Sequence, residues 1–430
     1  MAQTLHMNEM NQPSTTISEP RSTPPAHLDR DPELDLLLAC ARWPQRPADG
    51  ELIRMRAAQP LDWRRFLLLV EHHRLAPLVS HSLHAGVAES KSAEQQAVLG
   101  ELRQLASANT YRAIRSLAEL RRVVQEFQGA GVSVRVLKGI PLAQSVYGDL
   151  SLRSTGDLDL LIPEDAILEA DRLLRGAGYR GLFQIERFTP KRLAFYRSHW
   201  KDLAYRNPAT GFEVDLHWRC FRNRELPGAG LCATPLHDSV CFGSFQVETP
   251  PRMEHLLYLC VHGTLDGWLY LKSLADIAAE VRAMTETELD ALATLAAGYG
   301  VLPELTAALA LVRRYLATDH WSALLLTANH ATVAHILRYA DYTLVRGGFL
   351  ADREAVPIAT TLAFELGLRR NFRYRFELLL RVLFRARMWE TIPLPDFLFA
   401  MYPLLSPFEW AAYRMRQWWA KPGPGPMPSI

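Results

Sequence analysis

The sequence of 430 residues has few of the features that mark secreted or membrane proteins. Its five cysteines are scattered, and none of them forms a Cys-x-x-Cys pair, which argues against a disulfide framework and a zinc site. No stretch of about 18 residues is both uncharged and apolar enough to span a bilayer. Residues 1–20 lack the basic start and apolar run of a secretory signal. We therefore expect a soluble, cytoplasmic protein without a transmembrane segment.

The motifs of several large enzyme classes are also missing. No lysine follows a glycine, so a Walker phosphate loop is absent, and there is no His-Glu-x-x-His zinc motif. Residues 176–181 match the letters of Gly-x-Gly-x-x-Gly, but they follow an expected helix, whereas the dinucleotide fingerprint opens a helix after a strand. The net charge is only +2, so no global field points to nucleic acid.

Hydrophobic residues make up 49% of the chain, and their spacing divides the chain into regions. Two end segments have the composition of unstructured tails, and a stretch with strand periodicity lies between two helical parts. The expected regions are a disordered tail (1–30), a helical region (31–125), an α/β core (126–250), a helical domain (251–420) and a flexible tail (421–430).

Within the core, residues 132–136 alternate between valine and polar residues, and residues 157–162 (DLDLLI) form a second short apolar run. Two further runs, 202–206 and 212–218, bracket Asn-Pro-Ala-Thr-Gly, which is typical of a hairpin turn. A last strand is expected at 244–248. The predicted fold class is α/β (α+β), with a small mixed sheet that has helices on one side and is flanked by N- and C-terminal helical regions.

Two carboxylates stand out in the second expected strand. Because residues two apart on a strand point to the same face, Asp157 and Asp159 project together, although their neighbours are leucines. Paired carboxylates repel each other, and core packing gives no reason for the pair. Hard Mg²⁺ prefers carboxylate oxygens together with substrate phosphates, so we interpret the pair as a metal site. The alternative is a solvated strand end.

The second hairpin strand repeats this arrangement, since Glu213, Asp215 and His217 share one face. A third carboxylate on a neighbouring strand completes a site for displacement at phosphorus. Asp215 is the preferred candidate and Glu213 its competitor. His217 either orients a carboxylate or is a satisfied histidine.

Possible phosphate ligands precede the acidic pair. Lys138-Gly139 ends the first strand and begins a helix, where backbone N–H groups and a lysine suit phosphate. Arg153 offers another phosphate contact. The simpler readings are a surface lysine beside a tight turn and an arginine that neutralises a nearby acid.

The ordered set of these motifs resembles the uncharacterised nucleotidyltransferase family of the polymerase-β-like superfamily, over much of residues 60–280. The motifs are Lys138-Gly139, Tyr147-Gly-Asp, Arg153, Gly156-Asp157-x-Asp159 and Val-Asp215-Leu-His-Trp. The resemblance implies that Asp157, Asp159 and Asp215 hold Mg²⁺ (or Mn²⁺), and that Asp215 ligates a second metal or helps to deprotonate the acceptor. It also implies nucleotide binding at Lys138, Gly139, Arg153 and Gly156. The chain has Lys-Gly where the superfamily usually has Gly-Ser.

Three residues of a later helical segment are secondary candidates. His262, Lys272 and Asp276 are expected either to line the nucleotide site or, for the last two, to form an ordinary pair on a helix surface.

The segment Arg369–Arg387 contains seven arginines and one acid, with aromatic residues and leucines between them. Such a run is usually a solvated helix with one packed side, but it also suits contact with an acidic acceptor, a membrane surface or RNA. The aromatic residues Trp410, Tyr413, Trp418 and Trp419 extend this C-terminal segment.

The sequence therefore predicts a metal-dependent nucleotidyltransferase that moves NMP from an NTP to an acceptor hydroxyl or phosphate. One alternative is phosphate or pyrophosphate transfer on the same fold, and another is a non-catalytic adaptor that binds through the arginine-rich helix. The acceptor is open among RNA, a protein or peptide, and a small molecule.

Overall fold

The computed structural model describes residues 31–86, 92–233, 236–317, 326–346, 356–384, 386–409 and 415. The two expected tails, Arg385 and the four aromatic residues at 410, 413, 418 and 419 lie outside these ranges. Among the described residues, no helix is long and apolar enough to cross a membrane.

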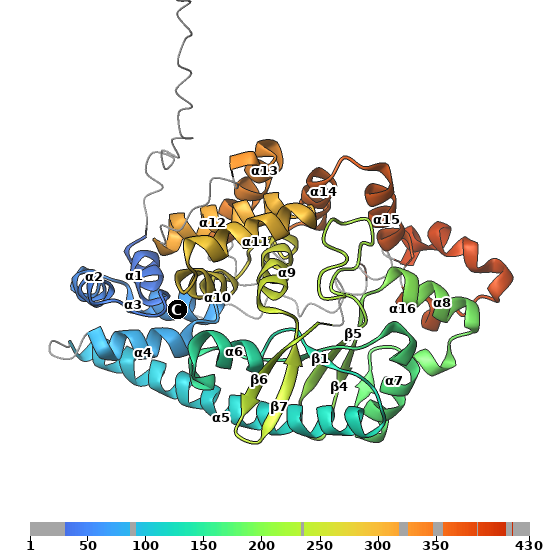
Figure 1. Ribbon diagram of the computed structural model, residues 1–430, viewed down its shortest axis with the longest axis horizontal. Helices are drawn as coiled ribbons and strands as arrows, with labels where there is room; N and C mark the ends of the chain where they lie inside the picture. Colours follow the sequence, from blue (N-terminus) through green and yellow to red (C-terminus); the bar gives the residue numbers. More distant parts are fainter. Residues whose placement is uncertain are drawn as a thin grey trace, which may run out of the picture.

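In the described part of the chain, five helices precede the sheet, and the fifth is the long helix along the base of the molecule in Figure 1. They are α1 (Pro32–Cys40), α2 (Pro47–Ala57), α3 (Trp63–His72), α4 (Ala76–Gly86) and α5 (Ala93–Gly129). Three more helices are inserted between the strands, namely α6 (Ile140–Tyr147), α7 (Ile167–Gly176) and α8 (Pro190–His199).

The described residues after the sheet are mainly helical. Its elements are α9 (Arg252–Leu265), α10 (Leu271–Arg282), α11 (Glu286–Gly298), α12 (Leu302–Leu316), α13 (His330–Asp341), α14 (Ile358–Leu368), α15 (Phe372–Leu383) and α16 (Ala386–Thr391). Because α7 ends at Gly176, the Gly-x-Gly-x-x-Gly match follows a helix, as expected, and is no dinucleotide fingerprint.

Within the described residues, seven strands form one mixed sheet in the order β3-β4-β5-β2-β1-β7-β6. Their bounds are β1 (Arg135–Val136), β2 (Leu158–Leu161), β3 (Arg180–Gly181), β4 (Asp202–Arg206), β5 (Glu213–His217), β6 (Asp238–Phe242) and β7 (Phe245–Thr249). The predicted fold class, a mixed sheet with helical flanks, is thus confirmed, and so is the hairpin, since β4 and β5 pair antiparallel.

The strand predictions differ from the structure in two respects. The valine alternation over 132–136 yields only the two-residue β1, although Val132 and Val134 are buried. The sequence analysis also missed β3 and β6. Among the described residues, the edge strand β6 pairs with β7 alone and has no buried residue. Its sequence, Asp-Ser-Val-Cys-Phe, therefore does not show the alternation of apolar and polar residues that marks a half-buried strand.

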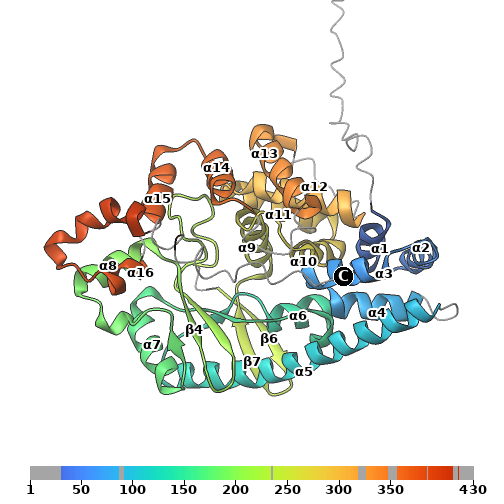
Figure 2. The ribbon, with the colours of Figure 1, turned by 180° about the vertical axis from the view of Figure 1, so that it is seen from behind.

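Helices α5 and α7 cover one face of the sheet, as the view from behind also shows (Figure 2). Their apolar residues, including Val124, Phe127 and Leu174, belong to the same buried cluster as Leu160 of β2 and Leu216 of β5. Because side chains alternate along a strand, the residues next to these leucines point to the other face. That face lies under the C-terminal helices.

The last described segment also closes this core. Met388, Trp389 and Tyr402 are buried in the cluster of the sheet, and Trp389 contacts Tyr196 and Trp200 edge-on. The sheet therefore depends on residues that follow it by more than a hundred positions.

Candidate active site

The two middle strands bring two of the predicted carboxylates side by side. β2 pairs parallel with β5, and the register sets Asp159 directly opposite Asp215. The Nε2 atom of His217 lies 3.3 Å from Oδ1 of Asp159. One ligand atom from each of Asp159, Asp215 and His217 falls within 4.8 Å of the others. Asp157 lies just before β2 and lines the same cleft, outside this close group.

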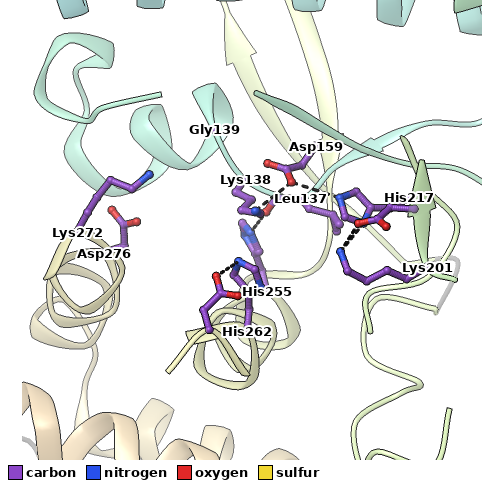
Figure 3. A network of polar contacts seen from close by, with 12 residues as sticks. Leu137, Lys138, Gly139, Asp159, Lys201, His217, His255, His262, Lys272 and Asp276 are labelled. Carbon is purple, nitrogen blue, oxygen red and sulfur yellow. Dashed lines mark hydrogen bonds and ion pairs between the residues drawn. The ribbon is translucent and has the colours of Figure 1, made fainter. Parts of the chain in front are cut away.

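Asp159 is buried and is held by cationic and polar neighbours (Figure 3). The Nζ atom of Lys138 lies 3.0 Å from its Oδ1. Burial alone would raise the pKa of Asp159, but Lys138 and His217 outweigh it and hold that pKa well below its usual range. The backbone N–H of Leu137 donates to the carbonyl of Asp159 at 3.0 Å, which ties the Lys138 turn to β2.

Asp215 has the opposite environment. Burial, followed by the negative charges of Asp159 and Asp157, raises its pKa to about 7. Its nearest electrostatic influences are thus other acids, and the ammonium of Lys201 offsets them only in part. A carboxylate in this position is stabilised by any further positive charge that enters the cleft.

His217 connects this centre to the start of the hairpin. The Nζ atom of Lys201 lies 3.3 Å from its Nδ1 and 2.5 Å from Oδ2 of Asp202. Burial lowers the pKa of His217, since it disfavours the imidazolium, and Lys201 adds to this effect. A neutral His217 next to ionised Asp159 therefore fits a histidine that orients a carboxylate. Neither Lys201 nor Asp202 was singled out in the sequence.

The turn at Lys138 requires a glycine. Gly139 has φ +81°, a left-handed conformation that favours glycine, and it directly precedes α6. The imidazole of His255 on α9 bonds to the carbonyl of Leu137, one residue before the lysine. The turn is thereby fixed from both the sheet side and the helical side, and the first N–H groups of α6 lie beside it.

Arg153 is buried and forms a two-pronged ion pair with Asp276 of α10, with N···O distances of 3.0 and 2.9 Å. The hydroxyl of Tyr147 donates to the same carboxylate at 2.9 Å, and a third nitrogen of Arg153 donates to the carbonyl of Gly139 at 3.3 Å. The arginine thus neutralises an acid 123 residues away and braces the turn before α6.

The secondary candidates also reach the cleft. Lys272 does not pair with Asp276 on a helix surface; its Nζ donates to the carbonyl of Ser154 at 3.2 Å. Burial, with help from Arg153, lowers the pKa of Lys272 to about 7. His262 stacks on Tyr258 and lies 3.4 Å from Asp266.

These side chains line one cleft of about 570 Å³. The predicted site residues on its wall are Lys138, Gly139, Arg153, Gly156, Asp157, Asp159, Asp215, His217, His262, Lys272 and Asp276. Glu213 is the exception, since its side chain is 57% exposed and faces Arg206 at 3.8 Å. The cleft also contains Lys201, Asp202 and Arg222, which the sequence analysis missed, and Arg381 of the predicted arginine-rich segment.

Comparison with known proteins agrees with this geometry. The profile of the uncharacterised nucleotidyltransferase family matches residues 59–317, more than half of the chain. The chain belongs to the uncharacterised nucleotidyltransferase family. The curated proteins and the solved structures give no significant match. The family assigns the chain broadly to the enzymes that transfer nucleotidyl groups.

The nucleotidyltransferase cleft is not made by the matched residues alone. Glu365 and Tyr374 line it from beyond residue 317, together with Arg381 of α15. In the arginine-rich segment, Arg369 and Arg381 form ion pairs with Glu304 and Glu365, at 2.5 and 2.8 Å. Arg370, Arg373 and Arg375 are exposed.

The residues of the acidic centre suit a divalent cation. Two carboxylates side by side on neighbouring strands supply the hard oxygen donors that Mg²⁺ and Mn²⁺ prefer. The ammonium of Lys138 already occupies a cation position on Asp159, while Asp215 has mainly acids around it. Both observations fit a centre that attracts positive charge.

Proposed function

We propose that the protein transfers a nucleoside monophosphate from an NTP to an acceptor hydroxyl or phosphate. In this proposal Asp157, Asp159 and Asp215 hold Mg²⁺ or Mn²⁺. The observation that carries it is the position of Asp159 directly opposite Asp215, with Asp157 lining the same cleft, in a chain of the nucleotidyltransferase family.

The triphosphate would bind where the cleft offers cationic and hydroxyl donors. Lys272 lines the cleft and has no carboxylate within ion-pair distance among the described residues. The hydroxyl oxygen of Thr155 is buried, lines the cleft and has no hydrogen-bond partner in the described part of the chain. Together with Lys138 and the N–H groups near Gly139, they form a set of phosphate ligands. Arg153 would keep this turn in place.

In the proposed reaction, an acceptor oxygen attacks the α-phosphorus of the NTP. A bond forms between this oxygen and phosphorus, the bond to the oxygen that bridges to the β-phosphate breaks, and pyrophosphate leaves. The acceptor hydroxyl also has to lose its proton to a base, and Asp215 would take this role only if it does not ligate the metal. A bound divalent ion would polarise the phosphate and neutralise its charge.

The test uses NTPs labelled at the α- or the γ-phosphate, with Mg²⁺ or Mn²⁺ and fractionated acceptors. Transfer of the α-label with release of pyrophosphate is expected, and Asp157→Asn or Asp159→Asn should each reduce it by at least about a hundredfold. Glu213→Gln is the matched control, since it removes an acid on β5 outside the cleft and should leave the rate unchanged. Transfer of the γ-label alone would establish phosphoryl transfer instead. Failure to bind NTP and metal would favour the adaptor.

A further inference from the structure

Two guanidinium groups share one wall of the cleft, on the segment that follows β5 and on α15. Arg222 and Arg381 both line the cleft, and both also line a small neighbouring cavity beside Trp200. Arg222 stacks over the ring of Trp200 at 4.5 Å, and its Nε donates to the carbonyl of His199 at 3.0 Å. These contacts fix the guanidinium through its flat face and one of its nitrogens.

The charge of Arg222 is not balanced by a direct partner. Among the described residues, no carboxylate lies within 4.0 Å of its nitrogens, whereas Arg381 is paired with Glu365 at 2.8 Å. Burial and the nearby charge of Arg381 together lower the pKa of Arg222 to about 10, and the more distant charges of Asp202 and Glu365 offset only part of this effect. A largely buried cation that has another cation beside it is costly unless an anion joins it.

A hydrogen bond of Asn223 connects the two segments that carry the arginines. The side-chain amide of Asn223, next to Arg222, donates to the carbonyl of Tyr374 on α15 at 2.9 Å. Its oxygen accepts from the N–H of Glu225 at 3.0 Å. Asn223 is therefore occupied on both sides, and it serves as the link that keeps the Arg222 segment against α15. This contact places Arg222 and Arg381 on the same wall of the cleft.

This wall combines family and non-family parts of the chain. The carboxylate centre and the Lys138 turn lie within residues 59–317, the range that the nucleotidyltransferase profile matches, and Arg381 lies outside it. Arg222 lies within the matched range, so the wall joins both parts of the chain. The proposed phosphate ligands Lys138, Thr155 and Lys272 account for the triphosphate, so an anion held by the two arginines fits the other substrate, the acceptor.

We propose that Arg222 and Arg381 bind an anionic group, a phosphate or a carboxylate, on the acceptor that receives the nucleotide. The identification of the ligand as the acceptor rests on the proposed function, whereas the binding of an anion at this site does not. A planar guanidinium forms paired hydrogen bonds with the oxygens of either group. The site would select acceptors that carry such a group close to the reacting oxygen.

The test is calorimetric titration of the full chain with inorganic phosphate and, separately, with acetate. Each titration is done alone and after saturation with a non-hydrolysable NTP analogue and Mg²⁺. We expect one of the anions to bind in both conditions, and Arg222→Gln to weaken this binding by at least about tenfold. Arg222→Lys, which keeps the charge without the fork, should retain part of it. Whichever anion binds identifies the group.

Arg224→Gln is the matched control. It also removes one arginine charge, two positions along the chain, but the side chain of Arg224 faces Glu164 outside the cleft. It should not change anion binding. Three results would each overturn the proposal. The anion binds wild type and Arg222→Gln equally, it does not bind the wild type, or its binding is lost once the analogue is present. An analogue that never binds would overturn the proposed function, while the titration without it still tests the anion site.

Discussion

The two opposed carboxylates of β2 and β5 show how a residue's neighbours set its chemistry. Asp159 has Lys138 and His217 against it and stays ionised, whereas burial and then the charges of neighbouring acids raise the pKa of Asp215. Between pH 3.8 and about 7, folded Asp215 binds a proton that the unfolded chain has released. Stability therefore falls as the pH rises through this window, and the cost is fully present above it.

Asp215→Asn should accordingly raise the melting temperature of the metal-free protein at pH 8, because it removes a buried negative charge that is also repelled by neighbouring acids. Mg²⁺ or Mn²⁺ should stabilise the wild type at pH 8 and have little effect on the variant. Thermal denaturation with and without metal measures both effects. Equal stabilisation of wild type and Asp215→Asn by metal would remove Asp215 from the proposed centre.

Lys272 gives a second prediction at this scale. Burial lowers its pKa from 10.5 to about 7, so between these values the unfolded chain binds a proton that the folded chain does not. Stability should rise with pH through this window, and the cost is fully present below pH 7. Lys272→Met should stabilise the ligand-free protein at pH 7 by about 1–3 kcal/mol. This is less than the full pKa shift would give, because solvent screens part of the charge of the lysine.

The same substitution should weaken NTP binding, since it removes a proposed phosphate ligand. Urea denaturation at several pH values and calorimetry with an NTP analogue are the two measurements. A variant that is less stable than the wild type at pH 7 would show that Lys272 is a structural residue.

At the scale of elements, the hairpin and the acidic strand could be predicted because their signals are local. The turn sequence lies between two alternating runs, and Asp157-x-Asp159 is visible within three residues. The short edge strands β3 and β6 have no such signal. The partner of Arg153 could not be predicted either, since the packing of α10 brings Asp276 from 123 residues away.

The turn before α6 can be tested with a matched pair of glycines. Gly139 and Gly131 both have a left-handed backbone, with φ +81° and +76°, and an added Cβ would meet no severe clash at either. Alanine at Gly131 should therefore cost about 1–2 kcal/mol of unfolding free energy, and alanine at Gly139 at least as much, because its ψ of −128° lies outside the left-handed helical region. Only Gly139→Ala should also weaken NTP binding, because Lys138 depends on that turn. If both variants bind NTP like the wild type, the turn is not a phosphate site.

At the scale of the whole molecule, the core of the sheet is completed by residues far outside the family match. Trp389 is 2% exposed and packs among Phe188, Phe195 and Phe399 beside the sheet. A chain that ends at residue 317 would leave this apolar surface uncovered, so we expect it to be insoluble or unfolded, even though it contains the whole match.

A point substitution separates packing from chain length. Trp389→Ala should lower the free energy of unfolding by about 3–5 kcal/mol, because it leaves a cavity between the C-terminal segment and the sheet core. Phe397→Ala is the control on the same segment, since that ring is 81% exposed and should matter by less than about 0.5 kcal/mol. Chemical denaturation measures both. If Trp389→Ala is as stable as the control, the C-terminal segment does not hold the sheet together. The α15 wall of the cleft would then have to be positioned by its contacts with the other helices alone.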